Sequence, residues 1–382
     1  MRKIVCLATS PWYPIPTRKQ QVMSRIPDAE ILYFDPSVTY LAPLKDKAAR
    51  PGLSNYKKEG VHPRENITVY SLPPVLPFFY KFRWINKLNQ RRMARFVCRK
   101  MQAHGFTDAV LWVYSPVTAD LVDLVPHKGL VYDCVDRHSA YGGLMDPALV
   151  DAMELELAKK ADHVFATADA LADRLRTVQP KTDMIPNGAN FERFVQAAQP
   201  QPLPDDMQGI PHPIFGFVGA LQSCIEYGYL EAAAKARPDW SFVLIGKEKP
   251  GVDLSALHAM PNVHFLGLKP NEQLPQYLAH FDACLNLFAK SDLSKDVSPL
   301  KFYEYLATGR PIVSTKQPDQ ILQYAPLIEI ADSQEEFISA CEKSCSDTAP
   351  EQIDARIEAG RACSWDSRVA QMCGILEGQG IL

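Results

Sequence analysis

Long apolar runs are absent from this chain of 382 residues. No run approaches the roughly eighteen apolar residues that a membrane-spanning helix needs, which excludes a transmembrane protein. The amino terminus has only a short apolar run before Pro11 and Trp12, so we expect a buried strand there and no secretory signal. The nine cysteines are scattered without a CxxC pair or a Cys/His cluster, which argues against disulfides and zinc and suits a reducing cytosol.

Glycine-rich phosphate loops are also missing. Neither GxGxxG nor GxxxxGK[ST] occurs, and dinucleotide-dependent dehydrogenases and P-loop kinases need such a loop at a strand–helix turn. No Asp-x-Asp pair follows a predicted strand in a metal-binding context. We therefore expect a reaction that needs neither a metal ion nor a bound cofactor.

The composition is that of a globular protein, with 47% hydrophobic and 22% charged residues. A chain of 382 residues is too long for one compact core and fits two domains. Residues 1–200 carry 27 Lys and Arg against 20 Asp and Glu, whereas the remainder carries 14 against 24. Halves of opposite charge suggest units with different partners, and a chance fluctuation in surface composition is the alternative.

Short apolar runs recur along both halves, with amphipathic stretches such as 146–160 and 274–280 between many of them. Continuous runs of this kind predict parallel strands that are buried on both faces by helices. The fold class is therefore α/β, with two doubly wound domains. The predicted strands are 4–8, 31–34, 67–71, 109–114, 129–132, 163–166, 214–218, 241–245, 263–266, 283–287 and 311–314.

A proline-rich segment separates the two series of strands. Residues 196–213 contain five prolines and few apolar residues, and proline cannot continue a helix or a central strand. We therefore expect a first domain at 1–200, a linker at 201–213 and a second domain at 214–363.

The most specific segment is 296–315. Ser298 is a good N-cap and Pro299 suits the first helical turn, so we expect a helix that runs to Thr308 and is closed by Gly309.

The start of this helix predicts an anion site. The backbone amides of Leu300 and Lys301 would be unpaired at the positive end of the helix dipole, and Lys301 would add a charge, so together they could bind a diphosphate. Glu304 could accept hydrogen bonds from the two hydroxyls of a ribose. The alternative is an ordinary capped helix with Lys301 and Glu304 solvated.

Short motifs follow one another in order along nearly the whole chain. They are Trp12 with RKQQVMSR (18–25), LWVYSP (111–116), VYDCVD (131–136), IPNGAN (185–190), FVGA (217–220), FVLIG (242–246), NVHFLG (262–267) and the 296–315 segment. By these motifs the sequence resembles GT-B glycosyltransferases, particularly the family 4-like and family 1-like bacterial enzymes of surface polysaccharides. Glu304 matches the second glutamate of the E-x7-E pattern of family 4, and Asp296 stands at the first. The segment 14–18 replaces a glycine pair that many relatives have.

The resemblance implies the GT-B architecture, in which two Rossmann-like domains face each other across a cleft and a C-terminal helix (364–382) packs back on the first domain. The second domain would bind a nucleotide sugar, and we expect a uridine diphosphate sugar. The implied donor-site residues are Gly219, Ala220, Gly246, Lys247, Leu266, Gly267, Asp296, Ser298, Pro299, Leu300, Lys301 and Glu304. For Gly219, simple turn chemistry is an equally good interpretation.

The acceptor side would come from the first domain. Asp133 and Asp136 follow the strand at 129–132, and a carboxylate there could take the proton from an attacking hydroxyl. We predict Asp136 as the base, with His138 as the second candidate and Arg18 neutralising phosphate charge. The alternatives are turn-forming or capping aspartates and a solvated arginine.

A basic aromatic strip occupies residues 73–100. From Lys81 to Lys100 there are eight Lys and Arg, no Asp or Glu, and interleaved Phe82, Trp84 and Leu88. This pattern suits adsorption on an anionic membrane, so we expect a cytoplasmic enzyme that attaches peripherally to the inner face of the membrane. An amphipathic core helix with a solvated basic face is the alternative, and no other feature favours nucleic acid.

The sequence thus predicts a hexosyltransferase-type glycosyltransferase (EC 2.4) that moves a sugar from a nucleotide sugar to a glycan or lipid-linked saccharide in polysaccharide or glycoconjugate synthesis. Two other functions stay open at this point. A GT-B sugar-nucleotide epimerase would use the same cleft on the donor alone, and a binding protein would keep the cleft without chemistry.

Overall fold

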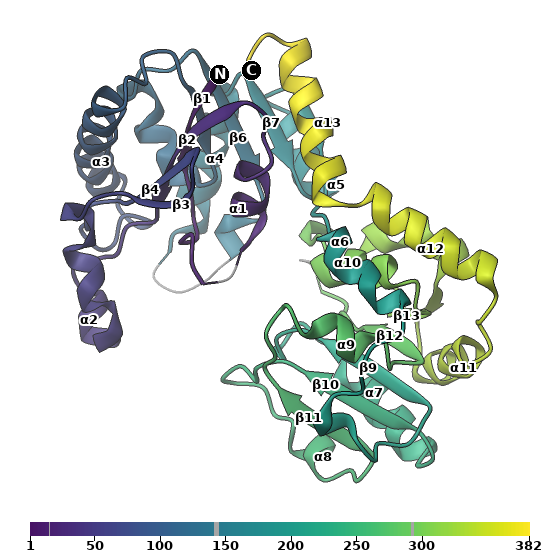
Figure 1. Cartoon of the computed structure of the whole chain (residues 1–382). Coiled ribbons are helices and arrows are strands. Elements are labelled where there is room, and N and C mark those ends of the chain that lie inside the picture. Colours follow the sequence, from purple (N-terminus) through teal and green to yellow (C-terminus); the bar gives the residue numbers. More distant parts are fainter. Residues whose placement is uncertain (15, 141–144, 292–293) are drawn as a thin grey trace. The chain divides into compact units, whose positions relative to one another are not determined.

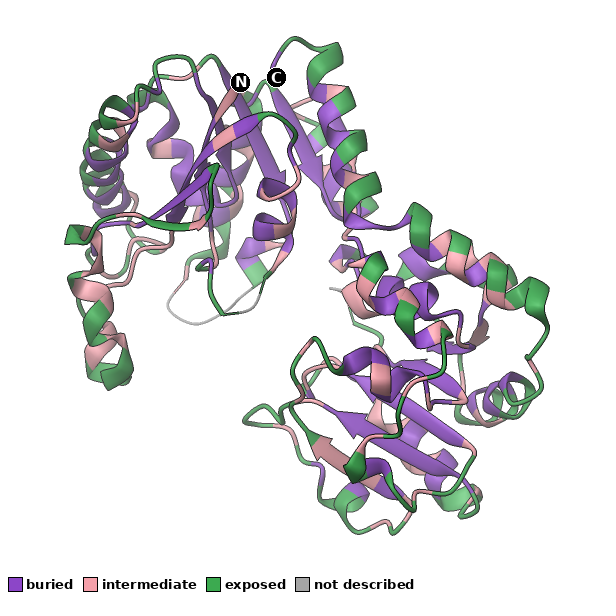
Figure 2. Cartoon of the chain, viewed as in Figure 1, coloured by how far each residue is buried: buried purple, intermediate pink, exposed green. Residues whose placement is uncertain are grey.

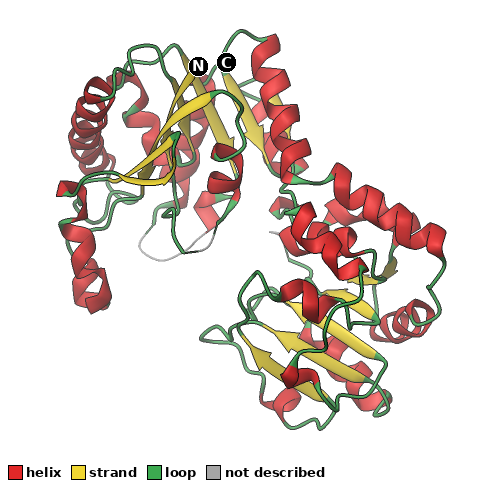
Figure 3. Ribbon diagram, viewed as in Figure 1, coloured by secondary structure: helices red, strands yellow, loops and turns green. Residues whose placement is uncertain are grey.

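The computed structural model describes residues 1–14, 16–140, 145–291 and 294–382, and it divides the chain into two compact units. Unit 1 consists of Met1–Pro186 together with Val369–Leu382, and unit 2 consists of Asn187–Arg368. Figure 1 labels elements of both units where there is room, and Figure 3 separates their helices from their strands.

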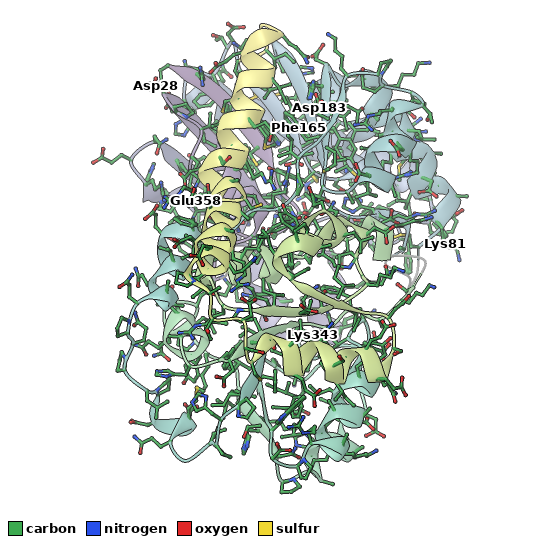
Figure 4. The ribbon with its side chains drawn as sticks, turned by 90° about the vertical axis from the view of Figure 1, so that its right-hand side faces the viewer. Asp28, Lys81, Phe165, Asp183, Lys343 and Glu358 are labelled. Atoms are coloured by element: carbon green, nitrogen blue, oxygen red, sulfur yellow. The ribbon has the colours of Figure 1, made fainter. Side chains whose placement is uncertain are left out.

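Unit 1 is built on an eight-stranded sheet in the order β3-β4-β2-β1-β5-β6-β7-β8. Its strands are parallel except for β3, which pairs antiparallel with β4. Phe165 and Asp183, labelled in Figure 4, are register partners on β7 and β8. The strands are β1 (Arg2–Leu7), β2 (Ala29–Asp35), β3 (Val61–Arg64), β4 (Ile67–Ser71), β5 (Val110–Val113), β6 (Gly129–Cys134), β7 (His163–Ala166) and β8 (Thr182–Met184).

Strands β5, β6 and β7 of unit 1 are buried along their whole length, as Figure 2 shows, which explains their continuous apolar sequence. One large cluster joins alternate residues of β1, β2, β5 and β6 to the inner faces of α3, α4 and α5. The helices of unit 1 are α1 (Arg18–Met23), α2 (Ala42–Lys45), α3 (Arg83–Ala103), α4 (Pro147–Lys160) and α5 (Asp169–Arg176).

The chain returns to unit 1 in its last helix, α13 (Trp365–Gly378). Met372 of α13 lies 4.0 Å from the Arg18 guanidinium on α1, and Gln379 forms a hydrogen bond with His163 of β7. A Cβ atom on Gly129 would lie 2.9 Å from Ile381, so the start of β6 packs closely against the last residues.

Unit 2 contains a six-stranded parallel sheet in the order β11-β10-β9-β12-β13-β14. Its strands are β9 (Ile214–Val218), β10 (Ser241–Ile245), β11 (Val263–Gly267), β12 (Ala283–Asn286), β13 (Ile312–Thr315) and β14 (Glu329–Ala331). Its helices are α6 (Phe191–Phe194), α7 (Tyr227–Ala236), α8 (Ser255–His258), α9 (Leu274–Leu278), α10 (Leu300–Thr308), α11 (Gln334–Ser344) and α12 (Pro350–Ala362).

Two apolar clusters cover the two faces of this sheet. One contains side chains of α6, α9 and α10, and the other contains side chains of α7, α8 and α11. Both units are therefore sheets with helices on both faces, as the sequence predicts, and each of the eleven predicted apolar runs overlaps a strand.

The domain limits differ from the predicted ones. Unit 2 begins at Asn187, because Phe191, Phe194 and Ala197 are buried in its core. Met207, inside the predicted linker at 201–213, is buried in the same core. The prolines of this segment end helices, but they do not keep the neighbouring apolar side chains out of the domain.

Among the described residues, no helix has both the length and the apolar character to span a bilayer.

Candidate functional site

In open α/β sheets, ligands bind outside the carboxyl ends of the strands, at the point where the strand order reverses. In unit 2 this point lies between β9 and β12, since β10 and β11 extend to one side and β13 and β14 to the other. Gly219 and Ala220 follow β9, and the segment that leads to α10 follows β12. The predicted donor residues therefore gather at the edge of the sheet where a ligand is expected.

Backbone hydrogen bonds link the turns that carry three of the predicted glycines. The amide of Gly219 donates to Ile245, and the amide of Gly246 donates to Gly267. A Cβ atom on Gly246 would lie 1.7 Å from the carbonyl oxygen of Gly219, so only glycine fits at Gly246. Gly267 has a φ of 67°, a conformation that other residues adopt at a cost.

The residues after β10 and β11 complete this edge of the sheet. Lys247 accepts a hydrogen bond from the amide of Leu221, directly after Ala220. Leu266 is half-buried, and Leu268 is 68% exposed. This edge is thus lined by backbone and by an exposed apolar side chain beyond β11.

The helix α10 starts one step later than expected. Pro299, not Ser298, occupies the cap position, and no side chain caps the helix. Ser298 is held by another partner: its hydroxyl accepts from the Asn187 amide at 3.0 Å, and its carbonyl accepts from Asn187 Nδ2 at 3.1 Å. The prediction of Ser298 as N-cap is wrong, because Asn187 takes the hydroxyl.

The first amides of α10 stay available. Within the described part of the chain, the backbone N–H groups of Leu300 and Lys301 have no hydrogen-bond acceptor, as expected for the first turn of a helix. The helix has nine residues, so its positive dipole end lies at these amides.

Lys301 and Glu304 contact each other. Lys301 Nζ donates to Glu304 Oε2 at 2.7 Å, and the Glu304 side chain is only 6% exposed whereas that of Lys301 is 30% exposed. The alternative of two solvated side chains is therefore wrong for Glu304. Asp296, eight residues earlier, is also buried and lies just before the segment that leads to α10.

A residue that the sequence reasoning missed attaches α10 to the end of β9. The hydroxyl of Tyr305 accepts a hydrogen bond from the amide of Val218 at 2.8 Å, one residue before Gly219. Tyr305 is fully buried, and it fixes the position of α10 beside the glycine edge, which is the edge of the sheet formed by Gly219, Gly246 and Gly267. The sequence of the 296–315 segment does not indicate this contact, because an aromatic residue on a helix is usually part of the hydrophobic core.

In unit 1 the strand order reverses between β1 and β5. Asp136 follows β6 and is exposed, whereas His138 is buried. The His138 Nε2 atom lies 3.0 Å from the carbonyl oxygen of Tyr114, so Nε2 carries the proton and donates it. Burial lowers the pKa of His138 from 6.5, which favours the neutral ring.

Arg18 lies in a buried ion pair. Its Nε contacts both carboxylate oxygens of Asp133 at 3.0 Å, and its Nη1 donates to the carbonyl of Pro186. The two side chains are 3% and 0% exposed. This pairing excludes the alternative of a solvated arginine and gives Arg18 a structural role. The catalytic role of Arg18 stays a prediction, and the ion pair with Asp133 does not favour it. Ile15, in the replaced glycine segment, lies outside the described residues.

Lys19, the neighbour of Arg18, was not singled out in the sequence. It is only 8% exposed, and its Nζ lies 5.5 Å from the centre of the Tyr114 ring. Burial lowers its pKa, while the nearby carboxylates of Asp136 and Asp133 act in the opposite direction. No group of three or more His, Cys, Asp or Glu side chains in the described residues could hold a metal ion.

Comparison with known proteins decides what these units are. Residues 212–347, which contain the whole sheet of unit 2, match the family model for "Glycosyl transferases group 1". The chain is a glycosyltransferase.

One curated relative supports this assignment. The glycosyltransferase is 26% identical over 279 residues to a protein of Bacillus subtilis (strain 168) that is provisionally named teichuronic acid biosynthesis glycosyltransferase TuaH. The match covers 69% of this chain and 70% of that protein.

Solved structures show that the fold is GT-B. Sucrose-phosphate synthase from Thermosynechococcus elongatus matches with a TM-score of 0.71 and 14% identity, over 100% of this chain and 99% of its own. An E. coli trehalose-6-phosphate protein gives 0.71 and 11%, over 98% and 99%. Anabaena HepE gives 0.65 and 16%, over 99% and 100%.

The family match covers all predicted donor residues of this glycosyltransferase, from Gly219 to Glu304. It does not reach Asp136, His138 or Arg18. The role of each individual residue stays a prediction.

Proposed function

We propose that unit 2 of this glycosyltransferase binds a uridine diphosphate sugar, and that the sugar passes to a glycan or lipid-linked saccharide in surface-polysaccharide synthesis. The base would lie along the backbone at 246–247 and 266–268, the ribose at Glu304 and the diphosphate at the start of α10.

One observation carries this proposal. A carboxylate that is 94% buried, Glu304, lies one turn inside a helix whose first amides have no acceptor among the described residues, at the point where the sheet order reverses. Lys301 binds one carboxylate oxygen of Glu304, and the described residues give the other, Oε1, no hydrogen-bond donor. A vicinal diol supplies such donors, and a diphosphate suits the amides and the Lys301 charge.

The ligands of two similar structures support the donor class. The HepE structure is in complex with UDP and glucose, and the E. coli structure is bound with UDP-2-fluoro glucose. The name of the Bacillus subtilis relative refers to teichuronic acid biosynthesis, which supports a polysaccharide product.

Asp136 is our candidate base in unit 1. Its exposure allows contact with an acceptor hydroxyl, whereas the pairing of Asp133 with Arg18 commits that carboxylate to the core. His138 is buried, so we rank it below Asp136 as a candidate base. Asp136→Asn should lower kcat by at least about a hundredfold and leave donor binding unchanged.

The donor is tested by a thermal-shift screen across nucleoside diphosphate sugars. A ligand at one hundred times its Kd stabilises the bound protein by about 2.7 kcal/mol, so the preferred donor raises the Tm most. If free sugars or unrelated dinucleotides shift the Tm as much as every UDP sugar, the proposal fails.

We also propose that transfer needs no metal ion, because Lys301 and the α10 amides can offset the charge of the leaving diphosphate. Full activity in excess chelator is the expected result. Loss of activity that magnesium or manganese restores would overturn this part.

Peripheral attachment to an anionic membrane is the last part of the proposal, and it rests on α3. Trp84 and Leu88 are 63% and 47% exposed. Further along the helix, a groove of about 740 Å³ is lined by Arg91, Arg92, Arg95 and Arg99, with no acidic residue among its lining. Like charges at i and i+4 repel, so this ladder is not explained by helix stability.

Flotation with phosphatidylglycerol vesicles tests the attachment. The triple variant R91Q/R95Q/R99Q should lose binding, whereas K235Q/K316Q/K343Q, with the same charge change on exposed lysines of unit 2, should keep it. Equal flotation of both variants, or none by the wild type at low salt, would contradict it.

A further inference from the structure

The start of α10 is held by a residue from a distant part of the sequence of unit 2. The main-chain N–H of Asn187 donates to Ser298 Oγ at 3.0 Å, and Asn187 Nδ2 donates to the carbonyl oxygen of Ser298 at 3.1 Å. Ser298 is only 9% exposed, and it precedes Pro299, the cap residue of α10. The two bonds therefore fix both the side chain and the main chain of the residue that leads into the helix.

The helix has little else to hold it at this end. Pro299 has no N–H group, and no side chain caps α10. The hydroxyl of Tyr305 attaches the helix to Val218, but Tyr305 lies more than one turn after the first helical residue. Tyr305 thus fixes the body of α10, whereas Asn187 fixes the segment that enters it.

The segment that begins with Asn187 contacts α10 a second time. It leads into α6, which packs beside α10 in the same apolar cluster (Figure 1). Lys301 Nζ lies 5.8 Å from the centre of the Phe194 ring of α6, and a cation is attracted to the face of an aromatic ring. One segment of the chain therefore restrains both Ser298 and Lys301, the two side chains that we place at the diphosphate.

Asn187 is itself held on both sides. The carbonyl oxygen of Pro186 accepts from Arg18 Nη1 at 2.9 Å, and because a peptide group is planar, this bond also sets the direction of the Asn187 N–H. A Cβ atom on Gly188 would lie 2.8 Å from the carbonyl oxygen of Cys363, so the chain is closely packed directly after Asn187. Asn187 can therefore act as a rigid support.

The bond from Asn187 also determines what the Ser298 hydroxyl can do. A hydroxyl has one hydrogen to donate and two lone pairs that accept. One lone pair accepts from Asn187, and within the part of the chain that the structure describes the hydroxyl donates its hydrogen to no acceptor. Accepting one hydrogen bond strengthens the bond that the same hydroxyl donates. The hydrogen is thus available for a phosphate oxygen, as are the first amides of α10.

We propose that Asn187 is a positioning residue of the donor site, which holds the Ser298 hydroxyl and the first turn of α10 in the arrangement that binds the diphosphate of the nucleotide sugar. The inference rests on the proposed function, because it requires a diphosphate at the start of α10. It adds a residue that lies 111 positions before Ser298 and outside the segment 212–347 that matches the family model.

Binding of UDP and of uridine to the full chain, each followed by ligand-observed NMR titration, tests the inference. Asn187→Ala removes the Nδ2 donor and keeps the main-chain N–H. It should raise the Kd for UDP about tenfold and leave the Kd for uridine unchanged, because uridine has no diphosphate. A residue that only stabilises the fold would not separate the two ligands. The matched control is Asn190→Ala, three positions along the same segment, whose side chain does not cap α6. This control should bind both ligands as the wild type does.

Two further variants sharpen the test. Asn187→Asp keeps the size of the side chain, which guards against a folding defect, but it places a carboxylate oxygen against the Ser298 carbonyl. It should weaken UDP binding more than Asn187→Ala does. Ser298→Ala removes the hydroxyl, and in that background Asn187→Ala should weaken UDP binding by a smaller factor than in the wild type, because the two residues act through the same group.

Unchanged UDP binding in both Asn187 variants overturns the inference, and so does an equal loss of affinity for UDP and uridine. In either case the wild type still binds UDP, so the proposed function stands. If the wild type itself binds no UDP, the proposed function fails and the inference fails with it.

Discussion

At the scale of single residues, the donor proposal depends most on Glu304, whose carboxylate is buried beside the start of α10. Glu304→Ala removes a charged acceptor from a ribose diol, and hydrogen bonds to charged groups contribute about 1.5–3 kcal/mol each. We expect the Kd for the preferred UDP sugar to rise at least tenfold, and Glu304→Gln to give a smaller increase because one acceptor oxygen remains.

Titration calorimetry measures these constants directly. Glu335→Ala, an exposed position at the start of α11, is the control and should leave the Kd unchanged. Unaltered donor affinity in Glu304→Ala would remove Glu304 from the site.

We expect the buried ion pair of Arg18 and Asp133 to contribute to the stability of the folded protein. Removing one partner of a buried ion pair leaves the other charge uncompensated and lowers the free energy of unfolding by about 3–5 kcal/mol. Arg18→Met should therefore lower the free energy of unfolding by that amount in a urea titration, while Arg95→Met on the exposed face of α3 should change it by less than about 0.5 kcal/mol.

The double variant Arg18→Met with Asp133→Leu separates charge from packing. It should be more stable than Arg18→Met alone, because no buried charge is left unpaired. Equal losses in both variants would mean that the guanidinium acts by packing against Met372 rather than by pairing.

At the scale of elements, the glycine edge of unit 2 leaves no space for a side chain at Gly246. A methyl group on Gly246 would overlap the backbone carbonyl of Gly219, which no side-chain rotation can relieve. Gly246→Ala should therefore cost more than about 4 kcal/mol or prevent folding. Gly374→Ala in α13, where nothing lies within 4 Å, should instead stabilise by about 0.5–1 kcal/mol, because alanine loses less entropy in a helix. Thermal unfolding of the two variants compares them, and a mild loss in Gly246→Ala would contradict the close approach.

The sequence predicted the central strands because burial on both faces makes them continuously apolar. It missed β3, β8 and β14, which are short and partly exposed, so their residues show no run that differs from a loop. The start of α10 was displaced by one residue for a different reason. The partner of Ser298 is Asn187, which lies 111 positions away, and no local pattern reports such a contact.

The same limit applies to Arg18 and Lys19. Neighbouring basic residues at the start of a helix suggest solvent exposure, yet both are buried beside Asp133 from a strand more than a hundred positions later. Helix and strand signals are local, whereas the state of a charged side chain depends on what the fold brings to it. The candidate site was thus predictable as a place on the sheet, but its internal pairings were not.

At the scale of the whole molecule, the two buried histidines should make stability depend on pH. Burial lowers the pKa of His138, with Glu154 and Asp136 opposing the shift and Lys19 reinforcing it. Burial likewise lowers the pKa of His163, with Gln379 and Asp183 opposing and Lys181 reinforcing. Both rings therefore favour the neutral form in the folded protein.

The unfolded chain takes up protons at these histidines as the pH falls below their ordinary value of 6.5, while the folded protein resists. The free energy of unfolding should then decrease between pH 7.5 and 5.5, a window that lies above the ordinary range of carboxylates. His138→Gln combined with His163→Gln should reduce this decrease, whereas His258→Gln, at an exposed position, should not. Melting curves at the two pH values measure the effect. An equal fall in Tm for the wild type and the double variant would show that other groups carry the pH dependence, because removing the two buried rings removes the protons that the unfolded state gains there.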